Sequence, residues 1–278
     1  GTLASVTKEE LSNLKALYER LGSSGVQTWV STPSFAQMCL VEKSFGAGMM
    51  PDLRRFLFCG ETLAPETAVQ LLERFPSAEV WNTYGPTEAT VATTSVRVDK
   101  DVLTKWSPLP VGYEMPGTQV LVLGENGHEM PEGERGELVI VGPNVSPGYL
   151  NRAELTDKVF GDRGGMRFYR TGDWGRKREG LIFFEGRMDG QVKVNGYRIE
   201  LGDLESNLRG LEEVADAVVL PVEKLGKVES LAAIVVLAQR TGESDFQVTA
   251  RLKTKLAERL PAYICLLYTS DAADDTPC

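Results

Sequence analysis

Asn82-Thr83-Tyr84-Gly85-Pro86-Thr87-Glu88 is the most informative stretch of this chain. It brings an aromatic ring, two residues that shape the backbone, a hydroxyl and a carboxylate close together in sequence. Tyr84 is suited to stacking on a purine, Gly85 allows a ligand to approach the backbone closely, and Glu88 is a hard oxygen ligand of the kind that Mg²⁺ binds. Thr87 is suited to donating a hydrogen bond to a phosphate oxygen. Taken alone, however, the stretch is more typical of a turn with a capping threonine.

Two further glycine-containing motifs follow in order, Tyr169-Arg170-Thr171-Gly172-Asp173 and then Gly186-Arg187-Met188-Asp189-Gly190-Gln191. The pattern predicts a turn at Asp173, whose carboxylate would accept hydrogen bonds from the ribose hydroxyls. Arg187 would donate to the same ribose or to a phosphate. Each residue has a structural alternative, an Asx turn or cap for Asp173 and a surface salt bridge for Arg187. The occurrence of all three motifs in one chain favours a nucleotide site.

The composition fits a globular protein of one large or two ordinary domains, since the 278 residues are 42% hydrophobic and 25% charged. The net charge of −9 argues against a nucleic-acid surface, because neutralising phosphates requires clustered Lys and Arg. Basic residues are nonetheless dense around the second and third motifs; they are Arg167, Arg170, Arg176, Lys177, Arg178, Arg187, Lys193 and Arg198. This cluster is either a solvated face or an anion site, and its overlap with the motifs favours the anion site.

Cysteine and histidine usage excludes several kinds of active site. The four cysteines show no metal-binding spacing, and the single histidine, His128, lies in Glu125-Asn126-Gly127-His128, which predicts a hairpin turn. A zinc site or a Ser–His or Cys–His nucleophilic centre therefore lacks its parts. No apolar run approaches the ~20 residues of a membrane span and no signal-peptide pattern is present, so we expect a cytoplasmic protein with free thiols. The first residue, Gly1, indicates a fragment or a processed chain.

Apolar periodicity predicts alternating strands and helices in the N-terminal part of the chain. Helices are predicted at residues 8–21, from Pro33 and at residues 65–75, and strands at residues 26–30, 55–59 and 79–83. Thr7 is the expected cap of the first helix, with Glu10 completing a capping box. Such alternation predicts βαβ units and a largely parallel sheet, at whose carboxyl ends ligands bind. Residues 59–61 and 82–88 both fall at predicted strand ends.

The pattern changes along the rest of the chain. Strands broken by Gly and Pro, at residues 119–123, 137–141 and 181–184, predict an antiparallel β subdomain. A compact α+β unit follows, with predicted strands at residues 214–221 and 231–237 and helices near residues 204–209 and 245–260. The expected fold is α/β, with domains at residues 1–187 (an α/β sheet portion, 1–104, and a β-rich subdomain, 105–187) and 188–263. Residues 264–278 show no periodicity and are expected to be a non-native tail, with a disordered native tail as the alternative.

Together these motifs resemble those of the adenylate-forming (AMP-binding) superfamily, which includes acyl-CoA synthetases, luciferases and the adenylation domains of peptide synthetases. The resemblance covers residues 1–263. Within the superfamily, residues 28–35, 56–61 and 82–91 most resemble enzymes that ligate D-alanine to a carrier protein. The resemblance implies a large AMP-binding domain with a parallel-sheet core and an antiparallel subdomain, followed by a small hinged α+β domain.

The resemblance also implies roles for individual residues. Thr87 and Glu88 would be catalytic, with Glu88 close to Mg²⁺. The nucleotide would be bordered by Gly60, Glu61, Asn82, Thr83, Tyr84, Gly85, Pro86, Thr87, Asp173, Phe184, Glu185, Gly186 and Arg187. Cys59, Gly85 and Val91 would shape a small amino-acid pocket. Asp189 would be the hinge, and the phosphopantetheine arm of the carrier protein would be faced by Lys193, Gly196 and Arg198.

The implied function is activation of D-alanine with ATP, release of pyrophosphate, and transfer to the thiol of a D-alanyl carrier protein for teichoic-acid modification. The protein would be a monomer that binds no nucleic acid and does not insert into membranes. The family's phosphate loop and substrate-binding aspartate would precede Gly1, and its catalytic lysine would follow Ile264, so the chain itself is expected to be close to inactive. Activation of another acid and a non-catalytic nucleotide-binding fragment are the alternatives. A dinucleotide-binding dehydrogenase is disfavoured, because no G-x-G-x-x-G follows a strand.

Overall fold

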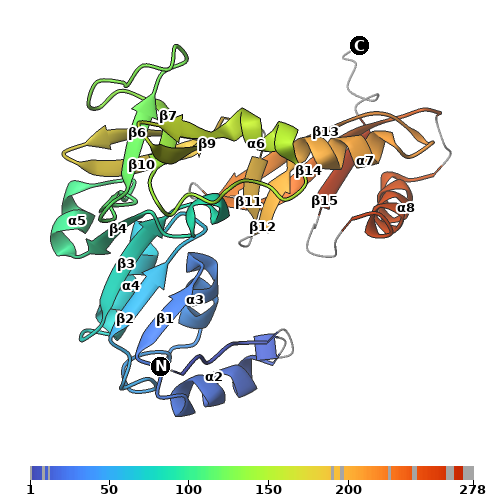
Figure 1. Cartoon of the computed structure of the whole chain (residues 1–278). Coiled ribbons are helices and arrows are strands. Elements are labelled where there is room, and N and C mark those ends of the chain that lie inside the picture. The colour runs from blue at the N-terminus through green and yellow to red at the C-terminus, as the bar shows by residue number, and fades with distance from the viewer. Residues whose placement is uncertain are drawn as a thin grey trace. The chain divides into compact units, whose positions relative to one another are not determined.

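The structure is a computed structural model, and it describes residues 2–7, 10–11, 13–188, 191–194, 197–224, 227–239, 243–260 and 266–271. The chain divides into two compact units, Gly1–Gly186 and Arg187–Cys278. Figure 1 shows their helices and strands. The first unit contains two five-stranded sheets, and the second contains one two-stranded and one three-stranded sheet among its described residues.

The first sheet of the first unit has the strand order β1-β2-β3-β4-β5. Its strands are β1 (Thr28–Ser31), β2 (Arg55–Phe58), β3 (Glu79–Tyr84), β4 (Thr94–Val98) and β5 (Tyr113–Glu114). The first three strands pair in parallel, which confirms the βαβ prediction. β4 and β5 pair antiparallel to their neighbours, so the sheet is mixed. The short connection from β3 to β4 explains this, since a parallel crossover needs roughly a dozen residues or more.

Two helices connect the parallel strands as the sequence predicts, α3 (Pro33–Leu40) and α4 (Pro65–Arg74). A further helix, α2 (Leu14–Ser23), precedes β1, and the single turn η1 (Thr87–Ala89) and α5 (Lys100–Lys105) follow β3 and β4. Both α3 and α4 begin at a proline, whose fixed φ suits the first helical position. Thr7 and Glu10 make the reciprocal contacts of a capping box. The helix α2 nevertheless starts later than predicted, at Leu14, because the Asn13 side chain caps it.

An aromatic cluster forms the core between this sheet and its helices. Trp29, Phe45, Phe56 and Phe75 are buried, and their neighbouring ring centroids lie 5.0–5.9 Å apart. Burying side chains of this size contributes roughly 1.5–3 kcal/mol each. The packing fixes the carboxyl ends of β1, β2 and β3 side by side, because Ser31, Phe58 and Asn82 are successive register partners.

The second sheet is antiparallel, as predicted. Its strands are β6 (Gln119–Leu123), β7 (Gly136–Val141), β8 (Phe160–Arg163), β9 (Met166–Arg178) and β10 (Leu181–Arg187), and α6 (Ala153–Val159) precedes β8. The order is β10-β9-β7-β6, with β8 paired to β9. His128 lies in a turn after β6, where Gly124 N donates to His128 O at 2.9 Å, which confirms the structural interpretation of this histidine. Every residue of β7 is buried, including the charged Glu137.

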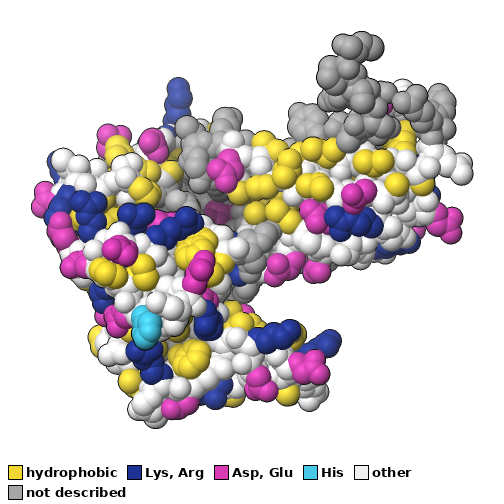
Figure 2. Space-filling model, turned by 90° about the horizontal axis from the view of Figure 1, so that it is seen from above, with side chains coloured by type: hydrophobic (Ala, Val, Ile, Leu, Met, Phe, Trp, Pro, Cys, Tyr) yellow, Lys and Arg dark blue, Asp and Glu magenta, His cyan; other side chains and the backbone are white. Residues whose placement is uncertain are grey.

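The second unit is an α+β unit. It contains β11 (Gln191–Val194), β12 (Tyr197–Glu200), α7 (Leu201–Arg209), β13 (Val214–Lys224), β14 (Lys227–Leu237), α8 (Asp245–Ala257) and β15 (Leu266–Asp271). Leu204 and Leu208 of α7 and Leu252 and Leu256 of α8 pack against buried residues of β13 and β14. Exposed hydrophobic residues alternate with the buried ones along β13; they are Val218, Leu220 and Val222. Figure 2 shows hydrophobic side chains gathered on the surface of this unit.

Part of the segment that sequence analysis sets apart as a tail belongs to a strand. Residues 266–271 form β15, which pairs in parallel with β14, with Leu231 opposite Leu266. The run Leu266-Leu267-Tyr268-Thr269 is apolar and rich in residues that favour strands. In the described part of the chain, no helix combines the length and the apolarity needed to cross a membrane.

The burial of Cys39 in α3 leads to a prediction about thiol reactivity. The Cys39 side chain is fully buried, and burial raises the pKa of its thiol to about 12. Because the thiolate is the reactive form, we expect iodoacetamide at pH 8 to modify the half-buried Cys59 and to leave Cys39 unmodified until the protein unfolds. Peptide mass spectrometry of native and guanidinium-treated protein measures this, and equal labelling of both residues in the native protein would contradict it.

Candidate functional site

The turn that follows β3 is strained. Thr90 and Val91 have φ values of 58° and 67°, in the left-handed region. This region is unusual for β-branched residues and costs about 1–2 kcal/mol each. Backbone hydrogen bonds close the turn, since Pro86 O accepts from Ala89 N and from Val91 N, each at 3.1 Å. Strain of this kind persists only where the surroundings enforce it, and it is often found at ligand sites.

The turn brings together the three residues predicted to shape a substrate pocket. A Cβ atom on Gly85 would lie 2.5 Å from Val91 O, so the close approach of these segments requires glycine. The Cys59 thiol, just after β2, donates to the same carbonyl with Sγ 3.4 Å away. The Val91 side chain is 55% exposed. The structure therefore places Cys59, Gly85 and Val91 side by side at the carboxyl ends of β2 and β3.

The first and second motifs meet through Tyr84 and Asp173. The Tyr84 hydroxyl donates to Asp173 Oδ2 at 2.5 Å, although the residues lie far apart in sequence. Tyr84 is 7% exposed and Asp173 is 5% exposed. The Tyr84 ring also contacts Phe184, with the centroids 6.0 Å apart. Three of the predicted nucleotide residues thus form one contact group within the first unit.

Asp173 lies in a bulged strand, so the turn predicted at this residue is wrong. In the pairing of β7 with β9, Glu137 is opposite Trp174 and Val139 is opposite Arg170, which leaves residues 171–173 facing Leu138. The Thr171 hydroxyl fixes the bulge by donating to Leu138 O at 2.7 Å and accepting from Asp173 N at 3.0 Å. Gly172 supplies the positive φ of 66°. Bulges often redirect a side chain beside a site, and this one sets the direction of Asp173.

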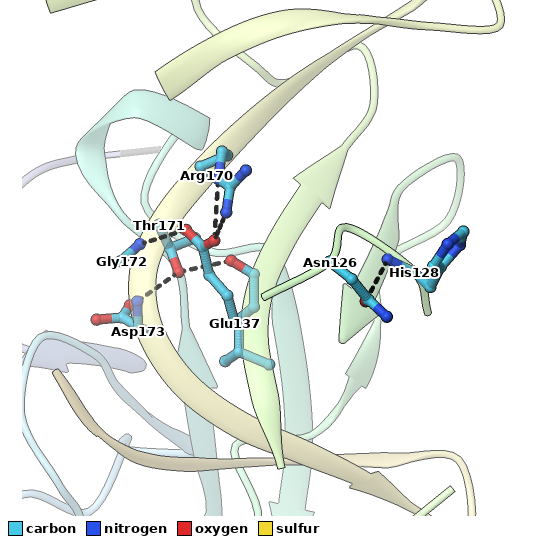
Figure 3. A network of polar contacts seen from close by, with 8 residues as sticks. Asn126, His128, Glu137, Arg170, Thr171, Gly172 and Asp173 are labelled. Carbon is cyan, nitrogen blue, oxygen red and sulfur yellow. Dashed lines mark hydrogen bonds and ion pairs between the residues drawn. The ribbon is translucent and has the colours of Figure 1, made fainter. Parts of the chain in front are cut away.

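Glu137 holds the same bulge from β7 and was not among the predicted site residues. Glu137 is only 5% exposed. Its carboxylate accepts hydrogen bonds from Arg170 Nε at 2.9 Å and from Gly172 N at 3.2 Å. Figure 3 shows Glu137 facing the bulge on β9. A carboxylate is rarely buried unless it is paired and hydrogen-bonded. The signal that sequence reasoning missed was therefore a charged residue at the start of a predicted strand that is otherwise apolar.

Several other predicted nucleotide residues have polar groups that bind within the protein. Asn82 Nδ2 donates to Pro110 O, and Thr83 Oγ1 donates to Phe58 O, both at 2.8 Å. Glu61 accepts from Ser34 N at 3.1 Å at the start of α3 and so caps that helix. Glu185 pairs with Arg176 and Arg135. Positive φ values of 92° and 102° are found at Gly60 and Gly186.

The residues predicted to act with the carrier protein lie in the second unit. Lys193 and Arg198 are register partners in the β11–β12 hairpin. Asp189, the predicted hinge, and Gly196 lie outside the described residues. Arg187 ends β10 and is the first residue of the second unit.

Glu88 follows Thr87 in η1, and Tyr149 donates to its Oε1 at 2.7 Å. Burial, followed by this hydrogen bond, raises the pKa of the Tyr149 hydroxyl, so it remains a donor at neutral pH. Among the described residues, no group of three or more His, Cys, Asp or Glu side chains is arranged to hold a metal. A single oriented carboxylate fits Mg²⁺, which typically keeps waters and takes most other ligands from substrate phosphates. Tyr149 and its loop were not predicted from the sequence.

Comparison with protein families identifies a match to the model described as "AMP-binding enzyme" over residues 1–150. The chain is 48% identical over 264 residues to a D-alanine--D-alanyl carrier protein ligase of Bacillus licheniformis, covering 95% of this chain and 53% of that protein. A ligase of the same description from Bacillus mycoides is also 48% identical, with 52% of its length covered. The chain thus spans about half the length of the curated relatives it matches.

Solved structures show the same relationship. The Vibrio cholerae adenylation domain AlmE in complex with glycyl-adenosine-5'-phosphate matches with a TM-score of 0.79 and 25% identity, over 93% of this chain and 49% of that one. Holo-PA1221, a protein containing adenylation and PCP domains, matches with a TM-score of 0.77 and 32% identity, over 93% of this chain and 44% of that one. The fold is therefore that of part of an adenylation domain.

The close approach at Gly85 predicts a specific sensitivity to substitution. In Gly85→Ala, the new methyl group would overlap Val91 O and Thr93 N, so we expect a loss of about 1–3 kcal/mol of unfolding free energy. Gly48→Ala is the matched control, because a Cβ at Gly48 meets nothing within 4 Å. Urea unfolding of both variants measures the difference. Equal stability of the two variants would show that the turn is not packed as described.

The bulge predicts a stabilising role for the Glu137 charge. Glu137→Gln removes the charge from the acceptor of the hydrogen bonds that Arg170 and Gly172 donate. We expect the free energy of unfolding to fall by about 1–2 kcal/mol, which is less than for a fully buried pair because the Arg170 side chain is partly exposed. The control is Glu125→Gln, at an exposed residue of the turn after β6. A urea midpoint for Glu137→Gln equal to that of the control would contradict the prediction.

Proposed function

This chain belongs to the AMP-binding enzyme family, and we propose that it serves ATP-dependent activation of D-alanine and its transfer to the phosphopantetheine thiol of a D-alanyl carrier protein. The similarity to D-alanine ligases along nearly the whole chain is the observation that supports this most directly. The product would be used in the D-alanylation of teichoic acids, and the reaction would take place in the cytoplasm.

In the first half-reaction, a carboxylate oxygen of D-alanine would attack the α-phosphorus of ATP. A new oxygen–phosphorus bond forms, the bond to the pyrophosphate oxygen breaks, and an aminoacyl-adenylate results. Catalysis of such a step is mostly positioning and electrostatic stabilisation. Asp173 would accept hydrogen bonds from the ribose hydroxyls, Thr87 would donate a hydrogen bond to a phosphate oxygen, and Glu88 would hold Mg²⁺. The bound metal would neutralise charge on the phosphate oxygens.

A pocket lined by Cys59, Gly85 and Val91 at the strand ends would suit a small side chain. Cys59, Gly85 and Val91 lie together, and the absence of a side chain at Gly85 is required by the fold itself. Cys59 would form a small, polarizable part of the pocket wall. We assign it no nucleophilic role, because the single histidine, His128, belongs to a turn after β6 rather than to the segments around Cys59.

In the second half-reaction, the carrier thiolate would attack the activated carbonyl carbon. The new thioester bond forms, and AMP leaves with the electron pair of the acyl–oxygen bond. Asp189 would be the hinge between the two half-reactions, and the carrier's arm would be contacted by Lys193, Gly196 and Arg198. Lys193 and Arg198 are register partners in the β11–β12 hairpin, and two neighbouring basic residues would suit an arm that bears a phosphate.

The first test uses binding rather than turnover, so that it applies to the 278-residue chain itself. Non-hydrolysable acyl-sulfamoyl-adenosine analogues that carry D-alanine, L-alanine, glycine or a fatty acid are each titrated into the protein, and binding is measured by calorimetry. We expect the D-alanyl analogue to bind about 10- to 200-fold more tightly than the L-alanyl analogue, which is the range available from placing one methyl group. Asp173→Asn should weaken all four analogues to a similar degree.

The outcomes separate the proposed function from its alternatives. If an analogue with another acyl group binds most tightly, that acid replaces D-alanine as the proposed substrate, and the proposed adenylating activity is kept. Binding of ATP and of every analogue with equal affinity would favour a nucleotide-binding chain without substrate selection. Amino-acid-dependent exchange of pyrophosphate into ATP then measures whether the bound substrates react. No binding of any analogue would overturn the proposal.

A further inference from the structure

Residues 142–150, which lie between β7 and α6, pack against the turn that carries Glu88, and no motif in the sequence pointed to them. Arg167 on β9 anchors the middle of this segment: Nε donates to Ser146 O at 3.1 Å and Nη2 donates to Pro147 O at 2.7 Å. The same guanidinium group lies 5.8 Å from the centroid of the Phe160 ring. The segment is therefore fixed to the second sheet through its backbone.

A second anchor lies at Gly148 and Thr156. Gly148 has a φ of 130°, and a Cβ atom there would lie 2.4 Å from Thr156 Cγ2, so only glycine fits. The Thr156 hydroxyl, on α6, accepts from Tyr149 N at 2.9 Å. These contacts determine where the Tyr149 side chain leaves the backbone.

On its other side, the segment binds the backbone around Glu88. Ser146 N donates to Glu88 O at 2.8 Å, and Asn144 Nδ2 donates to Ala89 O at 2.9 Å. Thr90 Oγ1 donates to Asn144 O at 2.8 Å. Three successive residues of the strained turn are thus tied to one segment, which helps to hold the left-handed backbone at Thr90.

The side chain of Glu88 is held by the same segment. The Tyr149 hydroxyl donates to Glu88 Oε1 at 2.7 Å. The Tyr149 ring packs edge-on against Phe160, with centroids 5.4 Å apart, and Phe160 contacts Tyr169 at 4.9 Å. A rigid aromatic group, rather than a flexible chain, therefore carries the donor that fixes one oxygen of the Glu88 carboxylate.

We propose that Tyr149 is a positioning residue that orients the Glu88 carboxylate for Mg²⁺, with residues 142–150 as its rigid support. The inference rests on the proposed function in one respect, the role of Glu88 as the protein ligand of the metal. A ligand carboxylate held by a second group loses less freedom when it binds, and loss of such a partner typically costs about 10- to 100-fold in metal affinity or activity.

The test is Tyr149→Phe, which retains the ring and removes only the hydroxyl. ATP affinity is measured by calorimetry on the full chain over a series of Mg²⁺ concentrations and in EDTA. We expect the Mg²⁺ concentration for half-maximal binding to rise about 10-fold, while ATP affinity in EDTA stays unchanged. Tyr113→Phe, at an exposed tyrosine of β5, is the control and should leave both values unchanged.

A double variant isolates the route through Glu88. In a Glu88→Gln background, Tyr149→Phe should produce no further change in the Mg²⁺ requirement, because the carboxylate that it orients is gone. An equal loss of ATP affinity with and without Mg²⁺ would show a purely structural role and overturn the proposal. Additive effects of the two substitutions would overturn it as well.

Hydrogen exchange provides a readout that needs no ligand. Tyr149→Phe should accelerate amide exchange in residues 86–91 of the ligand-free protein, because one of the contacts that hold the turn is lost. Unchanged exchange there, relative to Tyr113→Phe, would overturn the positioning role even if nucleotide binding is observed. Failure of the unsubstituted chain to bind ATP at any Mg²⁺ concentration would instead overturn the proposed function, and the exchange result would still decide whether Tyr149 fixes the turn.

Discussion

The hydrogen bond from the Tyr84 hydroxyl to Asp173 joins the two sheets of the first unit, and the candidate site is built around it. Tyr84 ends a strand of the mixed sheet, yet it packs in a core made mainly by the antiparallel sheet, together with Ala89. Burying a carboxylate such as Asp173 is costly unless donors compensate for the lost water. The need to satisfy this charge therefore fixes how the end of β3 meets β9, and every other site residue in the first unit lies on one of these two elements or beside them.

The strained turn and the strand bulge are compensated in the same way. Thr90 and Val91 adopt a left-handed backbone, and the bulge needs a positive φ at Gly172. In both places a side chain from a neighbouring segment supplies the missing contacts: Asn144 for the turn and Glu137 for the bulge. Both supporting residues are linked to the second sheet, Glu137 as part of β7 and Asn144 in the segment that follows it. The second sheet thus provides the rigid support, and the ends of β2 and β3 provide the exposed groups.

Sequence alone predicted the parts of the fold that depend on local chemistry. Pro33 and Pro65 mark helix starts because proline fixes φ, and the strands around Phe56 and Val80 follow from short apolar runs. It placed Asp173 in a turn, because a Thr-Gly-Asp run is typical of turns, whereas the bulge depends on Glu137 in another strand. The contact between Tyr84 and Asp173 and the segment at Tyr149 depend on residues far apart in sequence, so no local pattern reveals them. The strand at residues 266–271 was missed because its pairing with β14 is also non-local.

The hydrogen bonds of the site indicate how it would recognise a nucleotide. Asn82, Thr83 and Glu61 direct side-chain polar groups to backbone atoms of the protein. These groups would then act on a ligand through the shape of the strand ends more than through direct contact. Contacts to the nucleotide would come chiefly from the turn after β3, where Thr87, Thr90 and Val91 are exposed, and from the Asp173 and Glu88 carboxylates. Substitutions at the supporting residues Glu137 and Asn144 would therefore act through the geometry of the turn and the bulge, and would change the orientation of the two carboxylates as well as the stability of the fold.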